Sequence, residues 1–157
     1  MRQVPCSSDS LTTVFTKGEF MNTLSIETEV ALRRLVDQYC EGVIRRNADT
    51  WGATWAEDAS WNLGPGRQVA GREEIVKFWT TAMGAFDWVI QVAQHFSFDI
   101  DETAGSGTGR VIIRERFQRA DGVRGDLLAT YVDAYTKKSG QWLFSDRVLE
   151  VIERNPA

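Results

Sequence analysis

The stretch QVAQHFSFDID, residues 91–101, contains His95, the only histidine of the 157-residue chain. An imidazole titrates near neutral pH, so a histidine in a pocket is a candidate general acid or base. The alternation of side chains around it is typical of a β-strand. The two predicted faces of this strand are Ala93, His95, Ser97 and Asp99, and Phe96, Phe98 and Ile100.

Glu115 is the candidate partner of His95. It lies on the next predicted strand, and an antiparallel hairpin centred near Gly105 pairs position 95 with position 115. Directly opposed side chains share a face, with Cβ atoms ~5 Å apart, so Glu115 would orient the ring and raise its basicity. A slip of one residue would bring Arg114 or Arg116 opposite instead. The alternative is an ion pair on a solvated face, which contributes little.

The elements that position these residues form an α+β pattern. Ser25 is a plausible N-cap, and apolar residues repeat at helical spacing from there to about Arg46. Two more helices are predicted at 48–56 and 72–86. Strands are predicted at 59–63, 90–101, 109–119, 126–137 and 141–151. Helices followed by an antiparallel meander indicate one α+β domain at 23–157, with a flexible tail at 1–22.

Composition excludes several function classes. The formal net charge of −4 gives no reason to expect a nucleic acid or an anionic membrane as partner. No apolar run approaches the ~20 residues that span a bilayer. Cys6 and Cys40 do not resemble a disulfide framework, which predicts a cytoplasmic location. With one histidine and two scattered cysteines, we expect neither a metal site nor a cofactor.

Four strings resemble the SnoaL-like group of the NTF2-like superfamily. They are RRNADTWGATWAEDASW, VAGREEIVKFW, AQHFSFDID and ATYVDAYTKKSGQWLFSDRVLEV, and the resemblance covers about residues 25–152. It implies a cystatin-like cone, in which a bent sheet wraps around a long helix and leaves a ligand pocket at the open end. The group includes scytalone dehydratase and hexachlorocyclohexane dehydrochlorinase, which implies a small apolar cyclic or polyketide-like ligand.

The resemblance also implies roles for individual residues. His95 falls on the catalytic histidine of the two enzymes, but Ile44 stands where the dehydrochlorinase has its aspartate, and Glu41 is a minor alternative for it. Arg147 matches an arginine that contacts that aspartate. Tyr39 or Tyr131 would donate to a developing oxyanion. The implied ligand-binding positions are Ile44, Trp61, Phe86, Val111, Ile113 and Leu127, with Tyr39 and Tyr131 on the pocket wall.

Three functions remain open from the sequence. The first is a cofactor-independent lyase or isomerase with His95 as general base and Glu115 as its partner. The second is a non-catalytic ligand-binding module, which the isoleucine at position 44 favours. The third is a structural partner like the β-subunit of a ring-hydroxylating dioxygenase. If His95 points inward, the apolar residues of the other face point outward, which predicts a homodimer through the outer sheet face.

Overall fold

The computed structural model describes residues 24–156, so the tail predicted at 1–22 lies outside the described residues. The elements in chain order are α1 (Ile26–Arg45), α2 (Ala48–Gly52), β1 (Trp55–Asn62), β2 (Gln68–Ala70), α3 (Arg72–Met83), β3 (Phe86–Asp101), β4 (Ser106–Arg119), β5 (Arg124–Lys138) and β6 (Gln141–Pro156).

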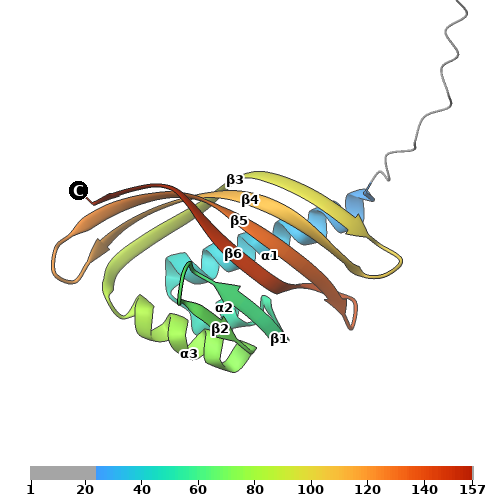
Figure 1. Ribbon diagram of the computed structural model, residues 1–157, viewed down its shortest axis with the longest axis horizontal. Helices are drawn as coiled ribbons and strands as arrows, with labels where there is room; N and C mark the ends of the chain where they lie inside the picture. Colours follow the sequence, from blue (N-terminus) through green and yellow to red (C-terminus); the bar gives the residue numbers. More distant parts are fainter. Residues whose placement is uncertain (1–23, 157) are drawn as a thin grey trace, which may run out of the picture.

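The strands form one sheet in the order β2-β1-β6-β5-β4-β3. All neighbours are antiparallel except β1 and β6, which are parallel. Figure 1 shows the long strands β3 to β6 arching over α1, with α2, α3 and the short strands β1 and β2 gathered at one end. The predicted α+β cone, with a mostly antiparallel bent sheet around a long helix, is confirmed.

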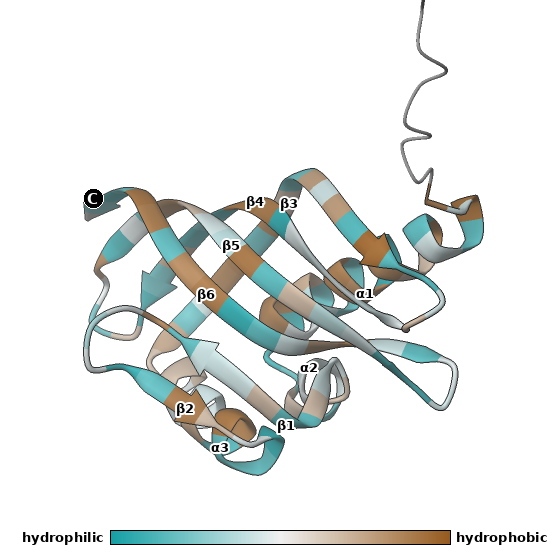
Figure 2. Cartoon of the chain, turned by 45° about the vertical axis from the view of Figure 1, so that its right-hand side comes forward, coloured by the Kyte–Doolittle hydropathy of each residue, from teal (hydrophilic) through white to brown (hydrophobic). Residues whose placement is uncertain are grey.

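Helix α1 forms as its sequence predicts. The Ser25 hydroxyl accepts a hydrogen bond from the Thr28 backbone N–H at 3.2 Å, which caps the helix. Arg46 ends it in the left-handed region with φ 51°. One face of the helix is buried against the sheet and α2, at Leu32, Leu35, Val36, Tyr39 and Val43. Along the neighbouring strands, apolar and hydrophilic residues alternate, as expected when one side of a sheet is covered (Figure 2).

The predicted register of the β3–β4 hairpin is wrong. Gln91, not His95, stands opposite Glu115, and His95 stands opposite Ile112. The turn lies earlier than predicted, because Asp101 already pairs with Ser106. In addition, the register shifts between Ala93 and His95, so that one extra residue bulges out of β3.

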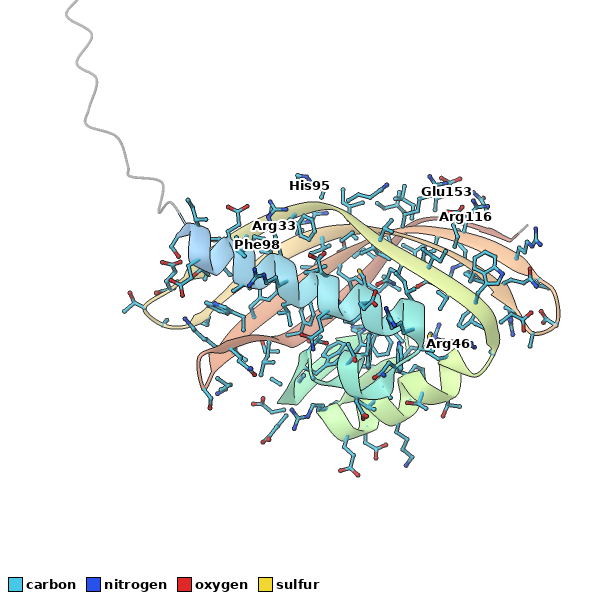
Figure 3. The ribbon with its side chains drawn as sticks, turned by 180° about the vertical axis from the view of Figure 1, so that it is seen from behind. Arg33, Arg46, His95, Phe98, Arg116 and Glu153 are labelled. Atoms are coloured by element: carbon cyan, nitrogen blue, oxygen red, sulfur yellow. The ribbon has the colours of Figure 1, made fainter. Side chains whose placement is uncertain are left out.

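This bulge, at Gln94, exchanges the two faces of β3. Before the bulge, the odd-numbered residues Val89 and Gln91 point inward and are only 1% and 3% exposed. After the bulge, the even-numbered Ile100 points inward and is 7% exposed. Phe96 and Phe98, which were predicted to point outward, pack against the core. In Figure 3, Phe98 lies on the side of α1, whereas the labelled His95, Arg116 and Glu153 lie on the convex side of the sheet. His95 is exposed there.

Smaller differences concern the end of the cone. Helix α2 ends at Gly52 and β1 already begins at Trp55, so the predicted helix 48–56 is too long. Strand β2 lies between the strand predicted at 59–63 and the helix predicted at 72–86, where no strand was predicted. Its hairpin with β1 closes because the Leu63 N–H donates to the Arg67 carbonyl at 2.9 Å. Gly64 and Gly66 adopt φ of 111° and 71°, which favours glycine at both positions.

Candidate active site

A cavity of about 160 Å³ lies at the end of the cone, between α1, α3 and the inner face of the sheet. Its walls are mainly apolar, with Val43, Trp61, Phe78, Trp79, Phe86 and Leu127 among them. It adjoins an outer hollow of about 430 Å³, which shares Phe86, Glu115 and Leu127 with it. Mostly apolar walls with a few convergent polar groups are typical of small-molecule sites.

Glu115 is the carboxylate of this cavity, and β4 holds it directly opposite Gln91 of β3. The Gln91 Nε2 donates to Glu115 Oε2 at 2.8 Å. Burial raises the pKa of Glu115, while the hydrogen bond from Gln91 and the charge of Arg154 partly oppose the rise. A carboxyl group with a raised pKa facing an apolar cavity suits general acid–base chemistry.

Glu115 of β4 and Cys40 of α1 together set the orientation of the Gln91 amide. Burial raises the pKa of the Cys40 thiol to about 11, so the thiol stays protonated at neutral pH. Its Sγ lies 3.8 Å from Gln91 Oε1 and donates to it. The amide oxygen is therefore turned toward α1 and the amide nitrogen toward Glu115, where it stabilises the ionised carboxylate.

Two tyrosines supply hydroxyl groups at the inner end of the cavity. The hydroxyls of Tyr39 and Tyr131 lie 3.2 Å apart, and both side chains are buried. Burial raises the pKa of both, so they remain protonated and can act as donors. The Trp61 indole N–H is also buried in the cavity wall and has no hydrogen-bond partner among residues 24–156. Such donors stabilise an oxyanion that develops nearby.

Arg147 lies behind the tyrosine pair and outside the cavity wall. It is fully buried and makes a two-pronged ion pair with Asp133, Nε to Oδ1 at 2.8 Å and Nη2 to Oδ2 at 3.1 Å. Its guanidinium carbon lies 4.2 Å from the Tyr39 ring centre and 3.8 Å from that of Tyr131. Burial disfavours the charge, but the charge and hydrogen bonds of Asp133 together with the two tyrosines outweigh this effect, so the pKa of Arg147 is raised. Arg147 therefore supports the tyrosine rings with a permanent positive charge.

The structure brings together only part of the predicted site. Glu115, Tyr39, Tyr131, Trp61, Phe86 and Leu127 line the cavity. Val111 and Ile113 are buried in the core without lining it. Ile44 is 39% exposed and points away from the cavity, which its neighbour Val43 lines instead. Glu41 is exposed and pairs with Arg45 one turn along α1.

His95 does not belong to this cavity. It is exposed on the outer face, and the bulge at Gln94 is the reason. The predicted contact with Glu115 therefore does not form.

Sequence reasoning missed several residues of the site, including Gln91, Trp79, Arg67 and Arg154. Gln91 could have been found from the sequence, because it is a polar residue on the inward-facing side of the strand that also carries Val89. Trp79 lies in the helix predicted at 72–86, where it is buried in the core and also lines the cavity. Arg67 and Arg154 carried no signal, since they come from a hairpin turn and from the end of the last strand.

Comparison with known proteins assigns the family. A family model for the SnoaL-like domain matches residues 24–148. The chain belongs to the SnoaL-like domain family. A comparison with curated protein sequences gave no match. Within residues 24–156, no group of three or more His, Cys, Asp or Glu side chains is placed to hold a metal ion, and no helix is long and apolar enough to cross a membrane.

Several solved structures share the SnoaL-like fold with this chain. A provisionally assigned scytalone dehydratase from Novosphingobium aromaticivorans has a TM-score of 0.78 at 19% identity, covering 83% of this chain and 88% of its own. A hexachlorocyclohexane dehydrochlorinase from Novosphingobium barchaimii has a TM-score of 0.75 at 16% identity, and the match covers 83% of this chain and 90% of its own. A provisionally assigned aromatic ring hydroxylase from N. aromaticivorans has a TM-score of 0.78 at 17% identity, and the match covers 85% of this chain and 96% of its own. At these identities the likeness concerns the fold.

Proposed function

We propose that this SnoaL-like protein binds a small apolar cyclic compound in the cavity and acts as a cofactor-independent lyase or isomerase, with Glu115 as general base. The observation that carries the proposal is the Glu115 carboxyl group, which is held by Gln91, has a raised pKa and faces an apolar cavity. His95, the base expected from the sequence, has no part in it because the side chain lies on the outer face.

In the proposed reaction, Glu115 removes a proton from a ring carbon next to a carbonyl group. The electron pair of the broken C–H bond moves onto the carbonyl oxygen, and the Tyr39–Tyr131 pair donates a hydrogen bond to that oxyanion. In an isomerase, the protonated Glu115 then returns the proton to another carbon. In a lyase, the electron pair instead expels a leaving group from the neighbouring carbon.

The test is proton exchange in D₂O with 2-tetralone and cyclohexenone as probes. The wild-type protein should accelerate deuterium incorporation, observed by NMR, and Glu115→Gln should lower the rate by ~10²-fold or more, because it removes the base. The matched control is His95→Gln, which should leave the rate within about twofold because the residue touches no part of the cavity. A loss of exchange in His95→Gln with none in Glu115→Gln would reverse the assignment.

A non-catalytic binding module is the second candidate. Two observations favour it: Ile44 stands where the resemblance implies an aspartate, and His95 lies outside the cavity. This candidate predicts saturable binding of the same cyclic ketones with no exchange above the rate in buffer. Binding without exchange would therefore select it over the enzyme.

A homodimer through the outer sheet face remains part of the proposal, with different residues from those first expected. Trp88, Ile90 and Val92 of β3 are 38%, 50% and 45% exposed and are neighbours on the outer face. An apolar row of this kind on a sheet is costly in water, and a second copy of the chain would cover it.

A further inference from the structure

The mouth of the cavity is lined by arginine side chains. The outer hollow has Arg67, Arg119, Arg124 and Arg154 on its walls, and the cavity behind it shares Arg67 and Arg154. They come from three separate parts of the chain: the β1–β2 turn, the β4–β5 hairpin and the end of β6. The chain as a whole has a net charge of −4, so this cluster of positive charge contrasts with the overall negative charge of the protein.

Most of these arginines lack a close ion-pair partner in the described part of the chain. Within residues 24–156, neither Arg67 nor Arg154 takes part in an ion pair. Arg119 has one weak pair, with Asp121 at 3.8 Å, in which both side chains are about half exposed. The Arg124 Nε donates to the neutral Gln118 side chain at 2.9 Å. By contrast, Arg114 and Arg116 on the outer face both pair with Asp126.

The backbone positions at this mouth are fixed, although the side chains are exposed. Arg67 is held in the β1–β2 turn, where its N–H donates to the Gly64 carbonyl at 3.0 Å. Arg154 stands opposite Leu127 in the sheet, and its charge reaches Glu115, because it lowers the pKa of that group. Both arginines line the cavity and the hollow at its mouth, so both are placed to bind one anion there with little backbone movement.

We propose that the ligand is a cyclic keto-carboxylate, whose ring lies in the apolar cavity and whose carboxylate is held at the mouth by Arg67 and Arg154. The inference rests on the proposed function, since it deepens the choice of ligand for that cavity. Arginine binds carboxylates through paired hydrogen bonds, and Glu115 repels a second carboxylate from the interior. Both effects orient the ligand ring-first, which brings its ring to Glu115 and the tyrosine pair.

The test compares 2-naphthoate with its neutral counterpart 2-naphthamide by isothermal titration calorimetry at low salt. The carboxylate should bind about tenfold more tightly, because charge-assisted hydrogen bonds are stronger than neutral ones. Arg67→Gln and Arg154→Gln should each weaken naphthoate binding about fivefold and leave naphthamide binding unchanged. Added salt should weaken only the carboxylate. Arg116→Gln on the outer face is the matched control and should change neither affinity.

The possible outcomes distinguish a failure of carboxylate recognition from a failure of the proposed function. Equal affinities for the two probes, or naphthoate binding that is insensitive to both cavity arginines, would overturn the carboxylate inference and leave the apolar pocket standing. If neither probe binds the wild-type protein, both the proposed ring-binding pocket and the carboxylate inference are contradicted. The deuterium exchange of neutral ketones tests catalysis independently of both arginines.

Discussion

At the scale of single residues, Glu115 combines a stability cost with a chemical use. A carboxylate that leaves water loses hydration, and one hydrogen bond from Gln91 replaces only part of it. The folded protein therefore favours the protonated form of Glu115 more than the unfolded chain does, which is why its pKa is raised. The same imbalance makes the ionised group a stronger base than an exposed glutamate.

The raised pKa of Glu115 predicts a pH-dependent gain in stability for Glu115→Gln. An acid whose folded pKa lies above its unfolded value of ~4.3 stabilises the fold below that value, and this contribution is lost as the pH rises through the folded pKa. The variant should therefore match the wild type near pH 3 and exceed it near pH 8 by up to about 1 kcal/mol. Urea denaturation at several pH values measures this. Glu153→Gln, on the outer face, is the control variant, and a Glu115→Gln variant that is less stable at pH 8 would contradict the argument.

Arg147 and Asp133 form the other charged feature of the interior. Both side chains are fully buried, so removal of one partner leaves a charge without compensation. We expect Arg147→Met to lower the free energy of unfolding by about 3–5 kcal/mol. The double variant Arg147→Met, Asp133→Leu should recover much of this loss, because no unpaired charge remains. Chemical denaturation of both variants checks the prediction, and a double variant no better than the single one would contradict it.

At the scale of elements, the predictions from sequence succeed where one period runs through a whole segment without a change of phase. Helix α1 has a single apolar face and a capping serine, so its course was predictable from spacing alone. Strand β3 keeps a period of two throughout, but the alternation changes phase at Gln94, and the sequence carries no mark of the change. The faces assigned from a single period were therefore right as far as Ala93 and wrong from His95 onward.

The candidate site was predictable in part, and most directly from the side-chain pattern of α1 and β4. Tyr39 and Glu115 lie on elements with an unbroken period, and both face the cavity as expected. Gln91 as partner of Glu115 depends on the exact hairpin register, which side-chain alternation does not determine. Arg67 and Arg154 come from a turn and from the end of a strand, so side-chain alternation does not place either of them at the cavity.

Helices α1 and α2 meet at Gly42, which gives a prediction at the same scale. A Cβ atom at this position would lie 2.7 Å from Trp51 Cβ, closer than van der Waals contact permits. Gly42→Ala should therefore push α2 away and lower the stability by about 1–3 kcal/mol, despite the better helix propensity of alanine. Thermal denaturation measures this. The neighbouring exposed Glu41→Ala is the control, and a Gly42→Ala variant as stable as the wild type would show that the contact relaxes freely.

At the scale of the whole molecule, the outer face of β3 predicts the state of association. Sedimentation at micromolar concentration should give twice the chain mass of 17.7 kDa. Ile90→Lys should shift the protein toward the monomer, because it places a charge in the apolar row with Trp88 and Val92. Ser97→Lys, exposed on the same face beyond the bulge, should leave the mass unchanged. A wild-type monomer would remove the homodimer from the proposal.

The tryptophan cluster beneath the cavity gives the protein an intrinsic spectroscopic signal for ligand binding. Trp51 and Trp79 stack with ring centres 4.5 Å apart, and Trp61 lies 5.4 Å from Trp51. Indoles this close share their excited states, so the cluster should give a paired positive and negative band in far-ultraviolet circular dichroism and transfer its excitation among its members. Trp61 and Trp79 also line the cavity. A ligand that enters the cone should therefore alter the emission of the whole cluster, and binding can be followed in the unlabelled protein.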